Sequence, residues 1–305
     1  MLALMSSAQR AYPRVILLAG PTASGKTALA IRLAQQHDGV IINADSMQVY
    51  ADIPILCASP TPEERSQAPH RLYGYLDAAQ PCSVGLWLEA VRIAIYETWQ
   101  QGKTPIMVGG TGLYLRSFIE GISPIPEIPP AIRDAVRALP TSEAYAWLCE
   151  HDTPMAAKLN AGDSQRISRA CEVMQHTGKS LLYWQSLPPQ PIIPEAQPLL
   201  YRLQIERDLL YARCNQRLEM MLQQGALEEL TTLLARKLPD SLPAMRAVGV
   251  PELTRHLRGE WTLPYATEKA QQATRNYAKR QLTWLRNQFP NAVQIAYPYE
   301  NLPDI

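Results

Sequence analysis

Short apolar runs alternate with longer amphipathic segments in the first part of the chain. The apolar runs are residues 15–19, 40–43 and 105–108, and residues 28–36, after the first run, have helical spacing. This alternation is typical of a parallel sheet with helices on both faces. It predicts an α/β fold in which each apolar run forms a buried strand.

The pattern changes between two proline clusters. One cluster lies at residues 124–130 and the other at 188–198, and the stretch between them is rich in Ala, Leu, Glu and Arg. Proline runs break helices and mark connectors. We therefore predict a helical insertion, residues 124–191, in a core made of residues 1–123 and 192–305. A continuous α/β domain with proline-rich loops is the alternative.

After the second proline cluster the pattern returns to a strand followed by helices. Residues 199–205 are a further apolar run, and helical spacing follows at residues 208–223, 226–235 and 267–288. These segments predict one returning strand and three helices at the end of the core.

The composition excludes several classes of protein. Hydrophobic residues make up 47% and charged residues 19%, which excludes a disordered or fibrous chain. No apolar run reaches the ~18 residues of a membrane-spanning helix, and residues 1–10 are too weakly apolar for a secretory signal. We expect a cytoplasmic protein with no membrane partner. The five cysteines form no C-x-x-C pair, so we expect reduced thiols rather than a zinc site or disulfides.

The charge is uneven along the chain. The net charge of +1 argues against a general affinity for polyanions, but residues 241–290 carry eight basic and three acidic side chains, a local charge of +5. In the last predicted helix Arg275, Lys279 and Arg286 fall within about 40° of one another and form one basic stripe. This stripe suits a polyanion such as RNA, and an ordinary solvated face is the alternative.

One motif identifies a phosphate site. The sequence from Gly20 to Thr27, GPTASGKT, matches G-x-x-x-x-G-K-[ST] and follows the strand at 15–19 where a helix begins. In such a loop the backbone N–H groups converge on phosphate oxygens, Lys26 adds a full positive charge, and the hydroxyl of Thr27 suits Mg²⁺. The motif predicts binding of a phosphate or diphosphate without identifying the molecule that carries it.

Two other strands also end in polar residues. Ligands of parallel α/β sheets bind at the carboxyl ends of the strands. A P-loop ATPase has a Mg²⁺-binding aspartate after such a strand, but the run at 105–108 is followed by Gly-Gly-Thr-Gly, which argues against an ATPase. The run at 40–43 leads into Asp45, which by position alone suits a metal ligand, a helix cap or a catalytic base.

Seven blocks, in order, resemble the tRNA dimethylallyltransferases, also called tRNA isopentenyltransferases. They are GPTASGKT at 20–27, ADSMQVY at 44–50, APHRLYGYLD at 68–77, VGGTGLYLRSFIEGISP at 108–124, DSQRISRACEV at 163–173, RAVGVPEL at 246–253 and AKRQLTWLR at 278–286. The resemblance implies a P-loop-type parallel sheet with an inserted helical domain. It also implies transfer of a dimethylallyl group from dimethylallyl diphosphate to the exocyclic amine of the adenosine immediately 3′ of the anticodon.

The resemblance assigns the chemistry to a few residues. The P-loop would hold the diphosphate, with Mg²⁺ bound through Thr27, and Asp45 would be the general base that takes the proton of the amine. Thr111 would reach the diphosphate and stabilise it as it leaves. Arg213 and Arg217 lie four apart on one helix face and would add positive charge, with surface salt bridges as the alternative. The P-loop residues concerned are Gly20, Pro21, Thr22, Ala23, Ser24, Gly25, Lys26 and Thr27.

The resemblance also implies contacts with a tRNA anticodon stem-loop, whose target base must turn out of its stack to be reached. We expect a monomer whose macromolecular partner is tRNA. The residues implied are Asp45, Ser46, Met47, Gln48, Thr111, Arg133, Gln165, Arg166, Ile167, Ser168, Arg169, Arg246, Ala247, Val248, Gly249, Val250 and Pro251.

Two departures from the family's pattern accompany these blocks. Ala51 and Ser59 stand where basic residues are common, and Gly85-Leu86-Trp87 replaces a common Asp-Phe pair. Three other functions are weighed against the resemblance: a P-loop kinase of small molecules, a prenyltransferase acting on free adenine nucleotides, and a non-enzymatic RNA-binding module. The strand that lacks a terminal acid and the basic segment at 241–290 count against the kinase.

Overall fold

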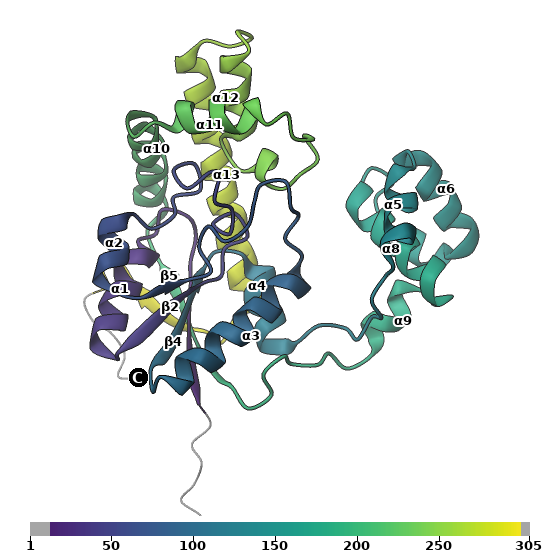
Figure 1. Cartoon of the computed structure of the whole chain (residues 1–305), viewed down its shortest axis with the longest axis horizontal. Coiled ribbons are helices and arrows are strands. Elements are labelled where there is room, and N and C mark those ends of the chain that lie inside the picture. Colours follow the sequence, from purple (N-terminus) through teal and green to yellow (C-terminus); the bar gives the residue numbers. More distant parts are fainter. Residues whose placement is uncertain (1–12, 300–305) are drawn as a thin grey trace, which may run out of the picture. The chain divides into compact units, whose positions relative to one another are not determined.

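A computed structural model describes residues 13–299, and its centre is one six-stranded sheet. All neighbouring strands are parallel, in the order β3-β2-β4-β1-β5-β6. Figure 1 labels β2, β4 and β5 of this sheet. The strands are β1 (Arg14–Ala19), β2 (Gly39–Asn43), β3 (His70–Arg71), β4 (Thr104–Gly109), β5 (Gln197–Gln204) and β6 (Val293–Ala296). The α/β fold with its parallel sheet is confirmed.

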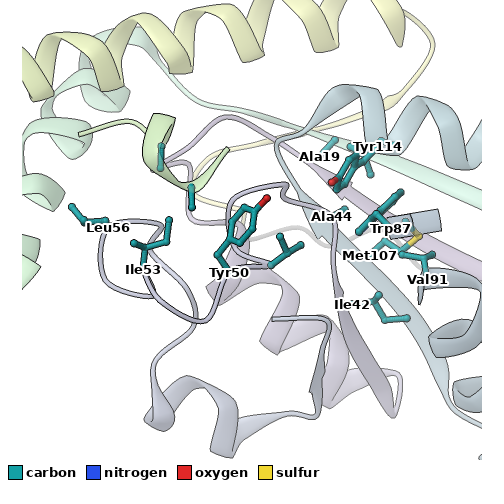
Figure 2. Packing of buried hydrophobic residues seen from close by; sticks show 14 of the residues in the cluster. Ala19, Ile42, Ala44, Tyr50, Ile53, Leu56, Trp87, Val91, Met107 and Tyr114 are labelled. Carbon is teal, nitrogen blue, oxygen red and sulfur yellow. The ribbon is translucent and has the colours of Figure 1, made fainter. Parts of the chain in front are cut away.

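The central strands β1, β2 and β4 are mostly apolar and buried because helices cover both faces of the sheet. Alternate residues of β1 enter different cores: Leu17 packs into one, and Ile16 packs into the other with helix α1 (Lys26–Gln36). In the first core, Trp87 stacks on Tyr114 with ring centroids 4.1 Å apart (Figure 2). Burial on both faces explains why these strands show no hydrophobic–polar alternation.

The other helices of this part of the chain are α2 (Pro62–Gln67), α3 (Val84–Gln100), α4 (Gly112–Glu120), α10 (Arg207–Gln223), α11 (Ala226–Ala235), α12 (Val250–Leu257) and α13 (Leu263–Gln288). Four helices around the sheet, α1, α10, α11 and α13, agree with the predicted segments, whereas α2, α3, α4 and α12 were not predicted. Helix α13 begins four residues before the predicted start, because Thr262 caps it by accepting the N–H of Tyr265. No helix within residues 13–299 is long and apolar enough to cross a membrane.

The register of the central strands brings three loops to one edge of the sheet. Ala19 of β1 is aligned with Gly109 of β4, and Asn43 of β2 with Val108. The chain segments that leave these strands therefore start side by side. They are the P-loop, the segment that holds Asp45, and the segment that holds Thr111.

The chain divides into two compact units. One contains the residues up to Ile119 and those from Ile192 onward, and the other is Glu120–Pro191. The second unit contains α5 (Pro130–Ala138), α6 (Thr141–His151), α7 (Thr153–Ala156), α8 (Ser164–Thr177) and α9 (Leu181–Ser186). It has its own apolar core, which includes Leu148 and Ile167. Its first boundary lies four residues before the predicted residue 124.

Candidate active site at the carboxyl edge of the sheet

The P-loop forms a tight turn between β1 and α1. Gly25, at φ +90°, precedes the first helical residue, and Ala23 also has a positive φ of 62°. Glycine adopts this backbone conformation without the steric cost of a Cβ. The amine of Lys26 donates to the carbonyl of Pro21 at 2.6 Å, and the hydroxyl of Tyr299 donates to the carbonyl of Ser24 at 2.7 Å. These bonds hold the loop around the start of α1.

The electrostatics of the loop favour an anion. Burial lowers the pKa of Lys26 from 10.5 to about 8, an effect that Asp45 opposes and Arg217 reinforces. The hydroxyl of Ser24 is buried, and the described residues offer it no hydrogen-bond partner. A buried amine with a depressed pKa and a hydroxyl without a partner would both be better satisfied by phosphate oxygens.

Asn43 fixes the position of Asp45. The Asn43 side chain is fully buried at the end of β2, where its Oδ1 accepts the N–H of Asp45 at 2.8 Å and its Nδ2 donates to the Asp45 carbonyl at 3.0 Å. The same Nδ2 donates to the carbonyl of Leu72. Asp45 Oδ1 accepts the N–H of Met47 at 2.9 Å, and within residues 13–299 no hydrogen bond is recorded for Oδ2. Sequence reasoning missed Asn43, although a buried amide two residues before an acid is a usable signal.

The side chain of Thr111 joins the segments that follow β2 and β4. Its Oγ1 accepts the N–H of Ser46 at 2.9 Å and lies 3.3 Å from the Ser46 hydroxyl. The structure thus brings Thr111 into contact with Ser46, the residue that follows Asp45. The contact of Thr111 with a diphosphate stays a prediction.

Helix α10 points two arginines at the P-loop. The guanidinium of Arg217 donates to the hydroxyl of Thr22, and burial lowers the pKa of Arg217. The guanidinium of Arg213 lies over the ring of Tyr297, 4.3 Å from its centroid. Both arginines line the cavity beside Lys26, so the surface salt bridges weighed as their alternative role are not what positions them.

Two cavities meet at Asp45. The larger, about 950 Å³, is lined by the P-loop, by Arg213 and by the apolar side chains of Ile55, Met220 and others. The smaller, about 270 Å³, is lined by residues 45–47 and 246–248 and by side chains of α13. The residues that line both are Thr22, Asp45, Cys57, Arg217 and Met221. A carboxylate shared by two cavities can act on a molecule in one while a second molecule lies in the other.

The wall of the larger cavity contains one of the departures from the family's pattern. In the segment 53–59, the N–H groups of Ile55 and Leu56 donate to the Glu229 carboxylate at 2.8 and 2.9 Å. The Gln48 amide donates to the carbonyls of Cys57 and Ala58. Ser59 lines this cavity, and its buried hydroxyl has no partner among the described residues. In the other departure only Trp87 lies in the core, where it donates to the Asn43 carbonyl, whereas Gly85 and Leu86 are exposed.

The predicted RNA strip at 246–251 is partly core and partly cavity wall. Arg246, Ala247 and Val248 line the smaller cavity, whereas Val250 is buried and is not part of its lining. Gly249 has φ +97° before Pro251 in the first turn of α12. Their contact with tRNA stays a prediction.

Helix α13 places different residues at the site than the sequence suggested. Tyr277 and Arg280 line the smaller cavity, but the predicted basic stripe did not include them. Arg275, which the stripe did include, donates to the Asn215 side chain at 2.6 Å. The stripe was chosen for charge alone, which carries no information about which side of a helix faces a cavity.

In the helical unit, a buried acid organises the basic residues. Glu172 is 1% exposed, and its two carboxylate oxygens accept from Arg137 at 2.9 Å and Arg169 at 3.4 Å. Arg166 is exposed and pairs with Asp163, which caps α8. Gln165 and Ser168 lie on the same helix, Ile167 is core, and Arg133 donates to the Ile128 carbonyl at 3.3 Å. Arg137 and Glu172 were not foreseen.

Comparison with known proteins decides the family. The model of the family described as IPP transferase matches residues 48–288, and the model described as isopentenyl transferase matches residues 13–82. The chain belongs to the IPP transferase family. The resemblance drawn from the seven blocks is therefore confirmed. The P-loop lies in the second matched range, and Thr111, Arg217 and the strip at 246–251 lie in the first.

Curated members of the family cover most of the chain. A tRNA dimethylallyltransferase of Rhodospirillum rubrum is 51% identical over 279 residues, which are 90% of this chain and 85% of that protein. One of Azorhizobium caulinodans is 46% identical over 92% of this chain and 91% of that protein.

Solved structures of the family share the fold. A tRNA isopentenylpyrophosphate transferase of Bacillus halodurans aligns with a TM-score of 0.68 at 30% identity, over 93% of this chain and 90% of that one. A eukaryotic dimethylallyltransferase acting on tRNA aligns with a TM-score of 0.78 at 26% identity, over 93% of this chain and 74% of that one.

Proposed function

We propose that this IPP transferase moves a dimethylallyl group from dimethylallyl diphosphate to the exocyclic amine of the adenosine immediately 3′ of the anticodon in tRNA. The observation that carries the proposal is the place of Asp45, on the shared wall of a cavity lined by the P-loop and a cavity lined by Arg246 and Arg280. The first cavity suits a diphosphate and the second a nucleotide of an RNA chain.

The larger cavity would hold the leaving group. Backbone N–H groups of the P-loop, Lys26, Arg213 and Arg217 converge on the place where the diphosphate would lie. Because the bond between the allylic carbon and the diphosphate oxygen breaks as negative charge develops on that oxygen, these groups stabilise the transition state more than the ground state. The apolar side chains of Ile55 and Met220 line the remainder of the cavity, where the dimethylallyl carbons would pack.

The proton transfer would take place at Asp45, on the wall that the two cavities share. As the amine nitrogen bonds to the allylic carbon, the diphosphate leaves and the amine must lose one proton. Asp45 is the carboxylate on the shared wall, and its Oδ2 is available to accept that proton. A positioned base of this kind contributes about 10²–10⁴-fold to a rate.

The residues present also fit Mg²⁺. Mg²⁺ takes oxygen ligands and is commonly held by one or two side chains together with phosphate oxygens of a substrate. The Thr27 hydroxyl lines the same cavity as Lys26 and would hold the ion with the diphosphate. Residues 13–299 contain no cluster of three His, Cys, Asp or Glu side chains for a metal, so the ion would depend on the substrate's oxygens. When bound, it would neutralise part of the diphosphate charge.

Transfer of label tests the proposal. Labelled dimethylallyl diphosphate is incubated with Mg²⁺ and unmodified tRNA, beside free AMP and beside tRNA whose target adenosine is replaced by guanosine. Label on the intact tRNA alone is the expected result. Label on AMP would indicate a prenyltransferase of free nucleotides, and turnover of ATP without label transfer would indicate a kinase; either result overturns the proposal.

The same proposal extends to the assembly and its location. We propose that the protein is active as a monomer in the cytoplasm, where tRNA is available. Light scattering at the concentration of the transfer assay tests the monomer. A dimer that loses activity on dilution would contradict it.

A further inference from the structure

A buried glutamine bridges two loops of the site. Gln281, on α13, is 6% exposed. Its Oε1 accepts the N–H of Thr22 in the P-loop at 2.8 Å, and its Nε2 donates to the carbonyl of Gly110 at 3.0 Å. A backbone N–H can only donate and a carbonyl can only accept, so these partners fix the orientation of the amide.

Helix α13 lies directly on the loop that contains Thr111. A Cβ added to Gly110 would lie 2.1 Å from Gln281 Nε2, and one added to Gly112 would lie 2.0 Å from Trp284 Cε3. Both distances are far shorter than contacts that real side chains make. The two glycines therefore allow the close approach of α13, and the helix in turn holds Thr111 between them.

The N–H and the hydroxyl of Thr22 both already have partners in other parts of the site. Its N–H is used by Gln281, and its hydroxyl accepts from Arg217 of α10. Thr22 thus ties the P-loop to two helices at the point where it lines both cavities. Of the P-loop N–H groups that follow Thr22, that of Ser24 donates to the Pro21 carbonyl at 3.3 Å. Among the described residues, the P-loop N–H groups left for a diphosphate are those of Ala23, Gly25, Lys26 and Thr27.

We propose that Gln281 is a positioning residue that sets the P-loop and the Thr111 loop at a fixed separation. This inference rests on the proposed function. Thr22 and Arg217 are bonded to each other on the wall that both cavities share, and Thr111 is bonded to Ser46, the residue after Asp45. The amide of Gln281 therefore controls how the allylic carbon and the amine would face each other. A 1 Å misplacement of reacting groups can cost roughly 10²-fold in rate.

The first test replaces the amide with an apolar chain of similar length. In Gln281→Met the single-turnover transfer rate should fall at least tenfold, while affinities for dimethylallyl diphosphate and tRNA stay within threefold. Gln271→Met is the matched control, because Gln271 lies on the same helix and donates instead to Asn215 and Glu219 of α10. The control should stay within twofold of the unaltered chain. A Gln281→Met rate that is also within twofold would overturn the proposal.

A double-mutant cycle separates positioning from general damage. If Gln281 acts by placing the Thr111 loop, Gln281→Met should cost much less in a Thr111→Ala background than alone, because residues acting through one contact are not additive. Equal fold-losses in both backgrounds would refute the role.

Gln281→Glu covers the case in which Gln281→Met does not fold. A protonated glutamic acid can donate to Gly110 and accept from Thr22, whereas the ionised form loses the donor. Burial at this position raises the pKa of the new carboxyl group. The ratio of the variant's transfer rate to that of the unaltered chain should therefore rise at least fivefold as the pH is lowered from 8.5 to 6. A flat ratio would count against the proposal.

Hydrogen exchange makes the inference independent of the reaction. The Thr22 amide should exchange at least tenfold faster in Gln281→Met than in the unaltered chain, and Gln271→Met should leave it unchanged. If the unaltered chain transferred no label, the proposed function would fail. The exchange measurement would still show whether Gln281 holds the Thr22 amide. Unaltered Thr22 exchange in Gln281→Met would overturn the inference.

Discussion

The depressed pKa of Lys26 predicts that diphosphate binding takes up a proton. Burial lowers this pKa from 10.5 to about 8, with opposing and reinforcing effects from Asp45 and Arg217. A bound diphosphate would place negative charge beside the amine and favour its protonated form. The amine would then be partly neutral before binding and charged afterwards.

The size of the effect follows from the pKa. With a value of about 8, the Lys26 amine is protonated to ~0.9 at pH 7, ~0.5 at pH 8 and ~0.1 at pH 9. Binding that restores the ordinary pKa would take up ~0.1, ~0.5 and ~0.9 proton at these three pH values. Above pH 8 the apparent Kd of the diphosphate should rise about tenfold per pH unit, and the whole change is limited to about 3 kcal/mol.

The same lowered pKa should make the free energy of unfolding of the ligand-free protein depend on pH. Between pH 8 and pH 10.5 the unfolded chain binds more protons at Lys26 than the folded chain does. The cost of burying the charged amine is therefore fully present below pH 8 and is relieved as the pH rises toward 10.5. The contribution of Lys26 to the free energy of unfolding increases over this window.

Calorimetric titration measures the proton uptake. Dimethylallyl diphosphate is titrated without tRNA at pH 7, 8 and 9, in buffers of different ionisation enthalpy, and the slope of observed enthalpy against ionisation enthalpy gives the number of protons. Lys26→Arg is the control, because its guanidinium stays charged over this range while protons contributed by the ligand are unchanged. Equal uptake by the two proteins at pH 9 would refute the reasoning, since Lys26 would then be charged before binding.

Three further predictions concern the site and the helical unit. Asp45→Asn keeps the shape but not the base, so single-turnover transfer should fall about 10²–10⁴-fold with diphosphate affinity within threefold; a normal rate would remove Asp45 as the base. Gly110→Ala places a Cβ 2.1 Å from Gln281 and should lower the free energy of unfolding by about 1–3 kcal/mol in urea titration; unchanged stability would mean that α13 yields at no cost. Arg166→Ala with Arg169→Ala should reduce the slope of log affinity for tRNA against log salt by about one per lost phosphate contact, and an unaltered slope would exclude both contacts.

The main strands and helices could be predicted because their signals are local. Residues 15–19 are an unbroken apolar run, and the structure buries every one of them. Strand β3 has two residues, and β6 is an edge strand with one buried side chain, so neither carries a pattern that differs from a loop. Helix α3 was missed although Trp87, Val91 and Ile95 recur at helical spacing and all three are buried.

The sequence could predict only those parts of the site that form local motifs. The P-loop is a contiguous motif, and Asp45 and Thr111 follow strands that can be recognised. The hydrogen bond between Thr22 and Gln281 joins residues 259 positions apart, and no local sequence pattern predicts it. The same holds for Glu229, whose bonds to Ile55 and Leu56 depend on α11 lying beside that segment.

The Gly-Gly-Thr-Gly segment explains why no acid stands at the end of β4. A Cβ at Gly109 would lie 2.0 Å from the Ala44 carbonyl, and at Gly110 it would meet Gln281. An aspartate therefore cannot replace either glycine unless the segment before Asp45 or helix α13 moves away. The carboxylate lies instead one strand over, at Asp45, where it faces a second cavity. An acid after β4 serves a metal and an attacking water in nucleotide hydrolysis. The sheet edge leaves no room for that acid, because the Ala44 carbonyl approaches Gly109 and Gln281 of α13 approaches Gly110. An acid at Asp45, on the wall of two cavities, suits the proposed transfer to a second substrate rather than to water.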